Sequence, residues 1–216
     1  MKKYIEKFSY SMLAFLMFGF GISLQIKADI GQSIFNSFCM LGSNLASIEI
    51  GTMINVFNFL FFLVYLILKA GPPKLKDIIQ IAAIMINGII INIFTYGLLN
   101  HIAIESYPLK VITFALGLIL ASISLGLILS IGIIQFPLEG LCIILSEKLK
   151  YSLGKIRMSF DIFFLTSTLI ITMVTKQPLF IREGTIISFF LLSKMLGVSY
   201  GFFKDKKLSF IQNTYD

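Results

Sequence analysis

The feature that most constrains this chain is a series of long apolar stretches that carry almost no charged side chains. The first, Phe8–Ile26, contains no Asp, Glu, Lys or Arg and follows three lysines. A run of roughly 18 or more apolar residues matches the hydrocarbon thickness of a bilayer. Because no water satisfies the backbone groups there, such a run has to be helical. The chain is therefore predicted to be an all-α membrane protein.

The composition agrees with this class and excludes others. Hydrophobic residues make up 57% of the chain and charged residues only 13%, whereas a soluble domain carries about 25% charged residues. The net charge of +7 comes from lysines at the ends of apolar stretches. That position is typical of cytoplasmic loops. We therefore expect the lipid bilayer as a partner and no nucleic acid.

Six transmembrane helices are expected, which makes residues 1–216 a single membrane domain. The first is expected to stay uncleaved, because it is too long for a signal-peptide core and no small-residue cleavage site follows it. The six are Phe8–Ile26, Ile50–Leu68, Ile78–Asn100, one within Val111–Gln135, one from Gly154 to just before Lys176, and Gly184–Phe203.

The basic residues predict the orientation. With the N-terminus inside, the inner segments hold 13 of the 18 basic residues, and Lys194 lies within the sixth helix. The outer segments hold only Lys27, Lys110, Lys176 and Arg182. Because basic loops stay in the cytoplasm, both termini are predicted to be cytoplasmic and the protein to lie in the cell membrane.

Two further segments are too short and too mixed to cross a bilayer. They are Gln32–Ser47, expected on the outer side, and Pro137–Lys150, expected on the inner side. Each is predicted to form a short helix that is either re-entrant or interfacial.

The two halves of the chain look related. Within positions 32–60, a shift of 103 residues pairs five identical residues and places Asn58 on Asp161; the identical pairs are Gln32/Gln135, Cys39/Cys142, Ser43/Ser146, Gly51/Gly154 and Phe57/Phe160. We therefore predict two three-helix repeats, at residues 8–100 and 110–203. An odd number of spans per repeat forces opposite orientations, as in many secondary transporters. The alternative is chance similarity between apolar helices.

Several local motifs carry a family resemblance. They are QFPLEGLCIILSEKL (Gln135–Leu149), GKIRMSFDI (Gly154–Ile162), REGT (Arg182–Thr185), KADIG (Lys27–Gly31) and IGT (Ile50–Thr52). On these motifs the chain resembles the YczE/YyaS/YitT-type family of bacterial membrane proteins, most closely its branch with a Pro-x-Glu-Gly turn. It departs from that pattern at Ile34, where many relatives have a proline. The resemblance implies a bacterial inner-membrane protein that moves a small molecule, without naming the substrate.

Two ionisable residues lie inside predicted spans, where a charge is costly and therefore marks a functional candidate. Asp161 lies two turns into the fifth span and Lys194 at the centre of the sixth. We expect both to face the bundle interior and to pair. The alternatives are a local pair between Arg157 and Asp161 at i, i+4 and snorkelling of Lys194.

The starts of the two short helices are the second candidate, because a helix N-terminus suits an anionic group. Ser33 or Gln32 is expected to cap the first helix, and Pro137 and Glu139 to open the second. If both starts meet near Asn58 and Asp161, they build a polar pocket that Asn87 could also line. The alternative is that both helices lie on the surface. Arg182, Glu183 and Thr185 indicate an ordinary interfacial helix start, with gating as the other reading.

The predicted substrate-binding residues are therefore Asp161, Asn58, Lys194, Glu139, Gln32, Ser33 and Asn87. No catalytic constellation, metal spacing or cofactor motif is recognisable, so we expect no enzyme, no cofactor and no metal. The favoured function is transport of a small polar organic compound, such as a vitamin-like molecule, through a site near the midplane. The alternatives are a substrate-binding subunit that works with a separate energising ATPase complex, or a membrane factor that regulates or assembles a partner.

Overall fold

The computed structural model describes residues 2–69, 71–72, 75–132 and 136–205, and every regular element within these ranges is a helix. The helices in chain order are α1 (Lys2–Ala28), α2 (Ile34–Ala46), α3 (Ile50–Lys69), α4 (Leu75–Asn92) with a π-helical extension η1 (Ile93–Leu98), α5 (Tyr107–Ile131), α6 (Pro137–Leu149), α7 (Leu153–Thr175) and α8 (Glu183–Asp205).

Within the described residues, six helices are long and apolar enough to cross a membrane: α1, α3, α4 with η1, α5, α7 and α8. They coincide with the six predicted spans, so the all-α class and a multi-pass membrane protein are confirmed. The two remaining helices, α2 and α6, have 13 residues each and are too short to cross. They occupy the two segments in which short helices were predicted.

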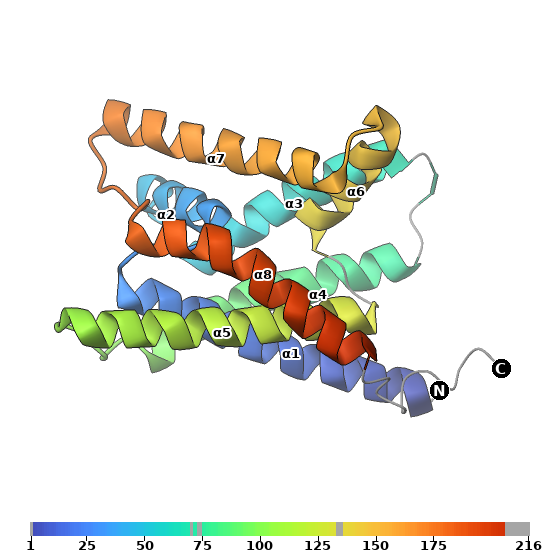
Figure 1. Ribbon diagram of the computed structural model, residues 1–216, viewed down its shortest axis with the longest axis horizontal. Helices are drawn as coiled ribbons and strands as arrows, with labels where there is room; N and C mark the ends of the chain where they lie inside the picture. The colour runs from blue at the N-terminus through green and yellow to red at the C-terminus, as the bar shows by residue number, and fades with distance from the viewer. Residues whose placement is uncertain (1, 70, 73–74, 133–135, 206–216) are drawn as a thin grey trace.

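The long helices run side by side along the long axis of the molecule (Figure 1). Helix α1 packs along α5, and α8 crosses α5 on its other side. The short helices pack across the two halves of the chain, since α2 contacts α7 and α6 contacts α3. The start of α1 and the end of α8 lie at the same end of the bundle (Figure 1).

Phenylalanine rings join the two halves where α2, α3 and α7 meet. Phe35 on α2 contacts both Phe61 on α3 and Phe164 on α7, with ring centroids 5.9 and 5.4 Å apart. Phe61 and Phe164 also contact each other at 5.9 Å. Aromatic pairs at this spacing add to the stabilisation from burial alone. Asn58 and Asp161 lie about one turn from this cluster on their helices, so their backbone positions are firmly held.

Local structure in the second half follows that of the first half at the same offset of 103 residues. Helices α2 and α6 begin and end at this offset, and α3 and α7 begin at it. Ser43 and Ser146 each donate to a carbonyl five residues on, both at 2.7 Å. The left-handed residues that end α1, α5, α2 and α6 also correspond; they are Asp29, Gly132, Ser47 and Lys150.

The halves differ in how their last two long helices meet. Helix α3 packs along α4, whereas α7 makes little contact with α8 in the described part of the chain. The backbone N–H groups of Ile50 and Gly51 donate to Tyr96 Oη (3.2 Å) and Asn92 Oδ1 (2.7 Å) across the α3–α4 contact. At the matching position on α7, an added Cβ at Gly154 would meet no described atom within 4 Å. A cavity of about 330 Å³ lies beside α7.

Candidate functional site

A cavity of about 330 Å³ lies between α5, α6, α7 and α8, and the start of α2 closes it. Two smaller cavities, of about 90 and 160 Å³, adjoin it. The largest and the smallest share Ser33, Glu139 and Arg157, so one set of polar side chains separates them. Both halves of the chain therefore line these adjoining cavities, and the volume of the largest of the three is within the range of small-molecule sites.

Three charged side chains form a cluster at the cavity wall. Arg157 donates from Nη1 to Glu139 Oε1 at 2.8 Å, and its Nε lies 3.5 Å from Asp161 Oδ1. The Asp161 side chain is 16% exposed, and those of Glu139 and Arg157 about a third. Among the described residues that line the three cavities, these are the charged ones. With both carboxylates ionised, the cluster carries one net negative charge.

The sequence explains why these three side chains meet. Arg157 and Asp161 lie one turn apart on α7, so both project from one face of the helix. Pro137 opens α6, where its missing N–H costs nothing, and Glu139 lies in the first turn. The left-handed residue Lys150 then ends α6 and turns the chain into α7. Glu139 and Arg157 are therefore brought together from positions 18 residues apart.

Uncharged polar side chains line the smallest cavity. Asn58 is 4% exposed and Asn87 1% exposed, and Asn36 and Gln25 are also buried there. The Asn87 Oδ1 atom has no hydrogen-bond partner in the described residues. In the largest cavity the Oγ atom of Ser188, 1% exposed, likewise has none. Buried polar atoms are nearly always paired, so these two atoms are candidates for contact with a bound molecule.

The structure brings together five of the seven predicted site residues. Ser33, Asn58, Asn87, Glu139 and Asp161 all line one or more of the cavities. Ser33 also caps α2, since its Oγ accepts from the backbone N–H of Asn36 at 3.3 Å. The starts of α2 and α6 thus meet at the smallest cavity beside Asn58.

Gln32 and Lys194 lie elsewhere. Gln32 is 5% exposed and its backbone N–H donates to Thr185 Oγ1, but it does not line the described cavities.

The expectation that Lys194 faces the bundle interior is wrong. Lys194 is exposed, and no ion pair between it and Asp161 occurs among the described residues. The cause is the helical period of 3.6 residues. Thr185 and Ser188 are buried and Leu192 faces the cavity, so this face of α8 turns inward. Two residues beyond Leu192 the chain has turned through about 200°, which places Lys194 on the outer side.

Arg157 is the main residue that sequence reasoning missed as a site residue. It was considered only as a local partner for Asp161, and that pairing is present at 3.5 Å. Because it lies near the inner end of the fifth predicted span, it was counted with the 13 basic residues of the inner segments. The available signal was the Glu139 carboxylate in the preceding short helix, which is the second partner of the guanidinium. Ser188, Gln25 and Asn36 were also missed, since single polar residues in apolar helices are common.

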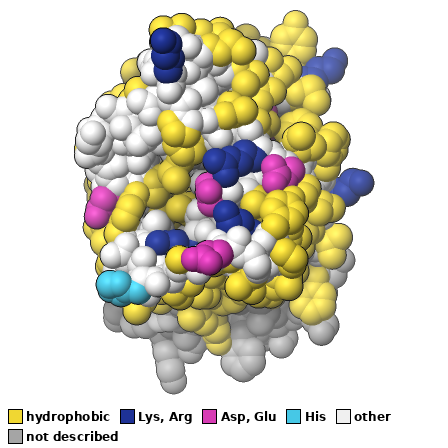
Figure 2. Space-filling view, turned by 90° about the vertical axis from the view of Figure 1, so that its left-hand side faces the viewer, with side chains coloured by type: hydrophobic (Ala, Val, Ile, Leu, Met, Phe, Trp, Pro, Cys, Tyr) yellow, Lys and Arg dark blue, Asp and Glu magenta, His cyan; other side chains and the backbone are white. Residues whose placement is uncertain are grey.

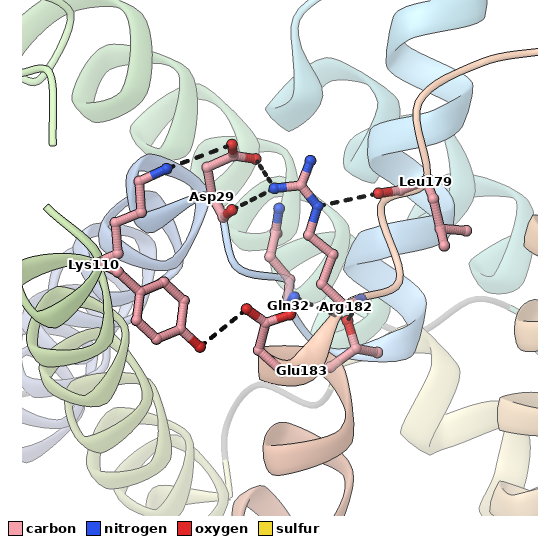
Figure 3. A network of polar contacts seen from close by, with 8 residues as sticks. Asp29, Gln32, Lys110, Leu179, Arg182 and Glu183 are labelled. Atoms are coloured by element: carbon pink, nitrogen blue, oxygen red, sulfur yellow. Dashed lines mark hydrogen bonds and ion pairs between the residues drawn. The ribbon is translucent and has the colours of Figure 1, made fainter. Parts of the chain in front are cut away.

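A second polar network closes one end of the bundle (Figure 2). There acidic and basic side chains gather at the centre of the face, with apolar side chains around them (Figure 2). Arg182 lies at the centre of this end-face network (Figure 3). Its Nη1 lies 3.1 Å from Asp29 Oδ1 and donates to the Asp29 carbonyl oxygen at 2.6 Å. Lys110 lies 4.0 Å from the same carboxylate, and Tyr107 donates to Glu183 at 3.1 Å.

Backbone contacts hold the start of α8 in the same place. The N–H of Gly184 donates to the Ile30 carbonyl oxygen at 2.7 Å. A side chain at Gly184 would collide with this carbonyl, because an added Cβ would lie 2.7 Å from it. The end-face network therefore joins the α1–α2 connection to the starts of α5 and α8. It lies at the end of the bundle opposite Leu153, the cavity-lining residue that begins α7.

These features define a multi-pass helical membrane protein with an internal cavity that combines a charged cluster and buried amides. The chain belongs to DUF6198, a family of unknown function, whose model matches residues 5–200. It is also similar to the uncharacterized protein YyaS of Bacillus subtilis (strain 168), with 25% identity over 141 residues, which is 65% of this chain and 69% of YyaS. No solved structure matches the chain. The YyaS-like part of the predicted resemblance is supported, and its YczE and YitT parts stay a prediction.

Proposed function

We propose that this protein is a small-molecule transporter of the cell membrane, with its substrate site in the cavity between the two halves of the chain. The observation that carries the proposal is the position of the Glu139–Arg157–Asp161 cluster. It borders cavities that are otherwise lined mostly by apolar side chains and by Ser33, Asn58 and Asn87. Polar groups concentrated within membrane-spanning helices are typical of substrate pathways.

The proposed architecture is a pair of inverted three-helix repeats. The matching helix boundaries and left-handed caps at the 103-residue offset support it. So does the exchange of short helices, in which α2 contacts α7 and α6 contacts α3. Three spans per repeat would point the halves in opposite directions, with α2 and α6 re-entering from opposite faces. The distribution of the basic residues supports cytoplasmic termini. A reporter fused after Phe203 should therefore be active in the cytoplasm and inactive outside.

The difference between the halves suggests how access to the site could change. In the first half α3 is packed on α4, while in the second half α7 stands apart from α8 beside the cavity. In an inverted pair, exchanging these two arrangements moves the opening from one side of the membrane to the other. The end-face network would be the closed side, on the outside of the cell, and the α7–α8 gap the open, cytoplasmic side.

A substrate-binding subunit of a multi-component transporter is the second candidate. It is favoured by the exposure of the last two helices, since only 17% of the α7 span and 6% of the α8 span are buried. Such a face could contact lipid or an energising ATPase complex. Co-purification of the tagged protein with an ATPase would favour this candidate over an independent transporter.

Transport is tested by counterflow in proteoliposomes. Purified protein is reconstituted, the vesicles are loaded with one compound from a panel of vitamins, amines and organic anions, and uptake of the same labelled compound is followed. The proposal expects protein-dependent counterflow of at least one compound, with loss in the Asp161→Asn variant. Absence of counterflow for compounds that bind to the protein would contradict independent transport.

A further inference from the structure

We propose that the ligand of this cavity is a small organic cation, carrying a protonated amine on an apolar body. This inference rests on the proposed function, because it names the class of molecule that the same site would take. It follows from the charge of the cluster, the unpaired acceptor atoms and the apolar wall.

The charge of the cluster favours a cation. Glu139 and Asp161 contribute two negative charges and Arg157 one positive charge, and the other described cavity-lining residues are uncharged. A monovalent cation would bring the cluster to neutrality, whereas an anion would raise its net charge to minus two. Because charge interactions are strong where water is scarce, this difference favours one sign of ligand.

The hydrogen-bonding groups point the same way. An ammonium group has three N–H donors and no acceptor, so it needs acceptor atoms around it. The cavities offer the carboxylate oxygens of Glu139 and Asp161, the Ser188 hydroxyl, and Asn87 Oδ1. Asn87 is only 1% exposed, and its Oδ1 atom has no hydrogen-bond partner among the described residues. An amine in the cavity could donate to all of these atoms, whereas a carboxylate ligand could accept only from the Ser188 hydroxyl among them.

The positively charged group among the described cavity-lining residues is already engaged. The Arg157 guanidinium donates to Glu139 and lies against Asp161, so an anion would have to displace a carboxylate from it. The two short-helix starts were predicted to suit an anionic group. At α2 the Ser33 hydroxyl accepts from Asn36, and at α6 the first turn already contains Glu139. The site therefore carries its own anionic groups.

The size and the wall of the cavity indicate an organic cation rather than a metal ion. No group of three or more His, Cys, Asp or Glu residues that could hold a metal occurs among the described residues. A volume of about 330 Å³ is far larger than a bare ion needs. The part of the wall that α5 and α8 contribute is apolar apart from Ser188 and includes Leu125, Leu129, Leu192, Leu196 and Phe189. An apolar body there would remove its surface from water.

The test measures binding with matched probes that differ only in charge. Thermal unfolding of the full-length protein in detergent and phosphate buffer is followed with phenethylamine, phenylacetate and phenethyl alcohol, and with butylamine, butyrate and butanol. We expect a saturable rise in unfolding temperature with an amine of either set and none with the matched acid or alcohol. The apparent amine affinity should fall at least about tenfold in Asp161→Asn and in Glu139→Gln, since a hydrogen bond to a charged group is lost.

Glu147→Gln is the matched control, because Glu147 lies exposed on the same short helix as Glu139 and lines no described cavity. It should bind amines like the unmodified protein. If Asp161→Asn fails to purify in folded form, Glu139→Gln carries the test, since the Arg157–Asp161 pair remains in it.

Three results would overturn the cation assignment: no stabilisation by any amine, equal stabilisation by the matched acid or alcohol, or amine binding that both variants retain. The proposed function fails separately. Amine binding without counterflow would contradict transport and leave the cation site standing. Acid-selective binding with counterflow would contradict the cation site and leave transport standing.

Discussion

The guanidinium of Arg157 donates to the carboxylate of Glu139 at 2.8 Å and thereby joins the start of α6 to the start of α7 across the wall of the cavity. The two side chains are about one third exposed, so the pair is only partly screened by solvent. Removing one member of such a pair costs more than replacing both, because a charge is left without its partner.

The first prediction concerns the cost of breaking this cluster. Arg157→Gln should lower the free energy of unfolding by roughly 2 kcal/mol, because it leaves two neighbouring carboxylates without a cation. Glu139→Gln should cost less, because the Arg157–Asp161 pair remains. The double variant should regain part of the loss. Thermal unfolding in detergent gives the comparison, and equal losses in the two single variants would contradict this account of the cluster.

The second prediction uses two glycines at equivalent positions of the two halves. A methyl group at Gly51 would overlap the carbonyl oxygen of Gly88 and the amide of Asn92, whereas at Gly154 it would meet no described atom within 4 Å. Gly51→Ala should therefore destabilise by roughly 1–3 kcal/mol through overpacking. Gly154→Ala should be neutral or slightly stabilising, since alanine is the better helix former. Similar unfolding temperatures for the two variants would show that α3 is not packed on α4 as described.

These two predictions also show what the sequence could and could not supply. Hydrophobic run length located all six long helices, because the bilayer fixes how many apolar residues a span needs. The polar starts of the two short segments, around Ser33 and Glu139, predicted where those helices begin. The 103-residue offset predicted which residues occupy equivalent positions, but not that Gly51 is packed while Gly154 is open.

The remaining features depend on contacts between helices. Lys194 was expected inside because it lies at mid-span. In the structure Thr185 on the inward face of α8 contacts Gln32 in the α1–α2 connection and Ser37 on α2, and Lys194 lies on the other face. Arg157 was expected only as an alternative local partner of Asp161, one turn away on the fifth span. Its place in the cavity wall depends on the turn that brings Glu139 back beside it. Neither fact is visible in a single stretch of sequence.

The third prediction separates Lys194 from Asp161. Because Lys194 is exposed on α8, Lys194→Met should leave both the unfolding temperature and the response to amines unchanged. Asp161→Asn should keep the fold and lose the amine response. The same thermal-unfolding titration measures both variants. Loss of amine binding in Lys194→Met would place this lysine in the site and contradict the orientation of α8.

The fourth prediction concerns the end-face network. Arg182 binds both the carboxylate and the backbone carbonyl of Asp29, so Arg182→Gln should loosen the start of α8 from the α1–α2 connection. Exposed ion pairs contribute little to stability, and the unfolding temperature should change by only a few degrees. The main effect should be on access to the cavity from this end.

Sided labelling of the cavity tests the central claim most directly. Ser188 lines the largest cavity, and a Ser188→Cys variant would be made in a Cys39→Ala/Cys142→Ala background. Right-side-out and inside-out membrane vesicles are then treated with a membrane-impermeant thiol reagent. The account predicts labelling from the cytoplasmic side alone, with labelling from the outer side appearing only when Arg182→Gln is added. Labelling from the outer side in the unmodified network, or from neither side in any variant, would contradict it.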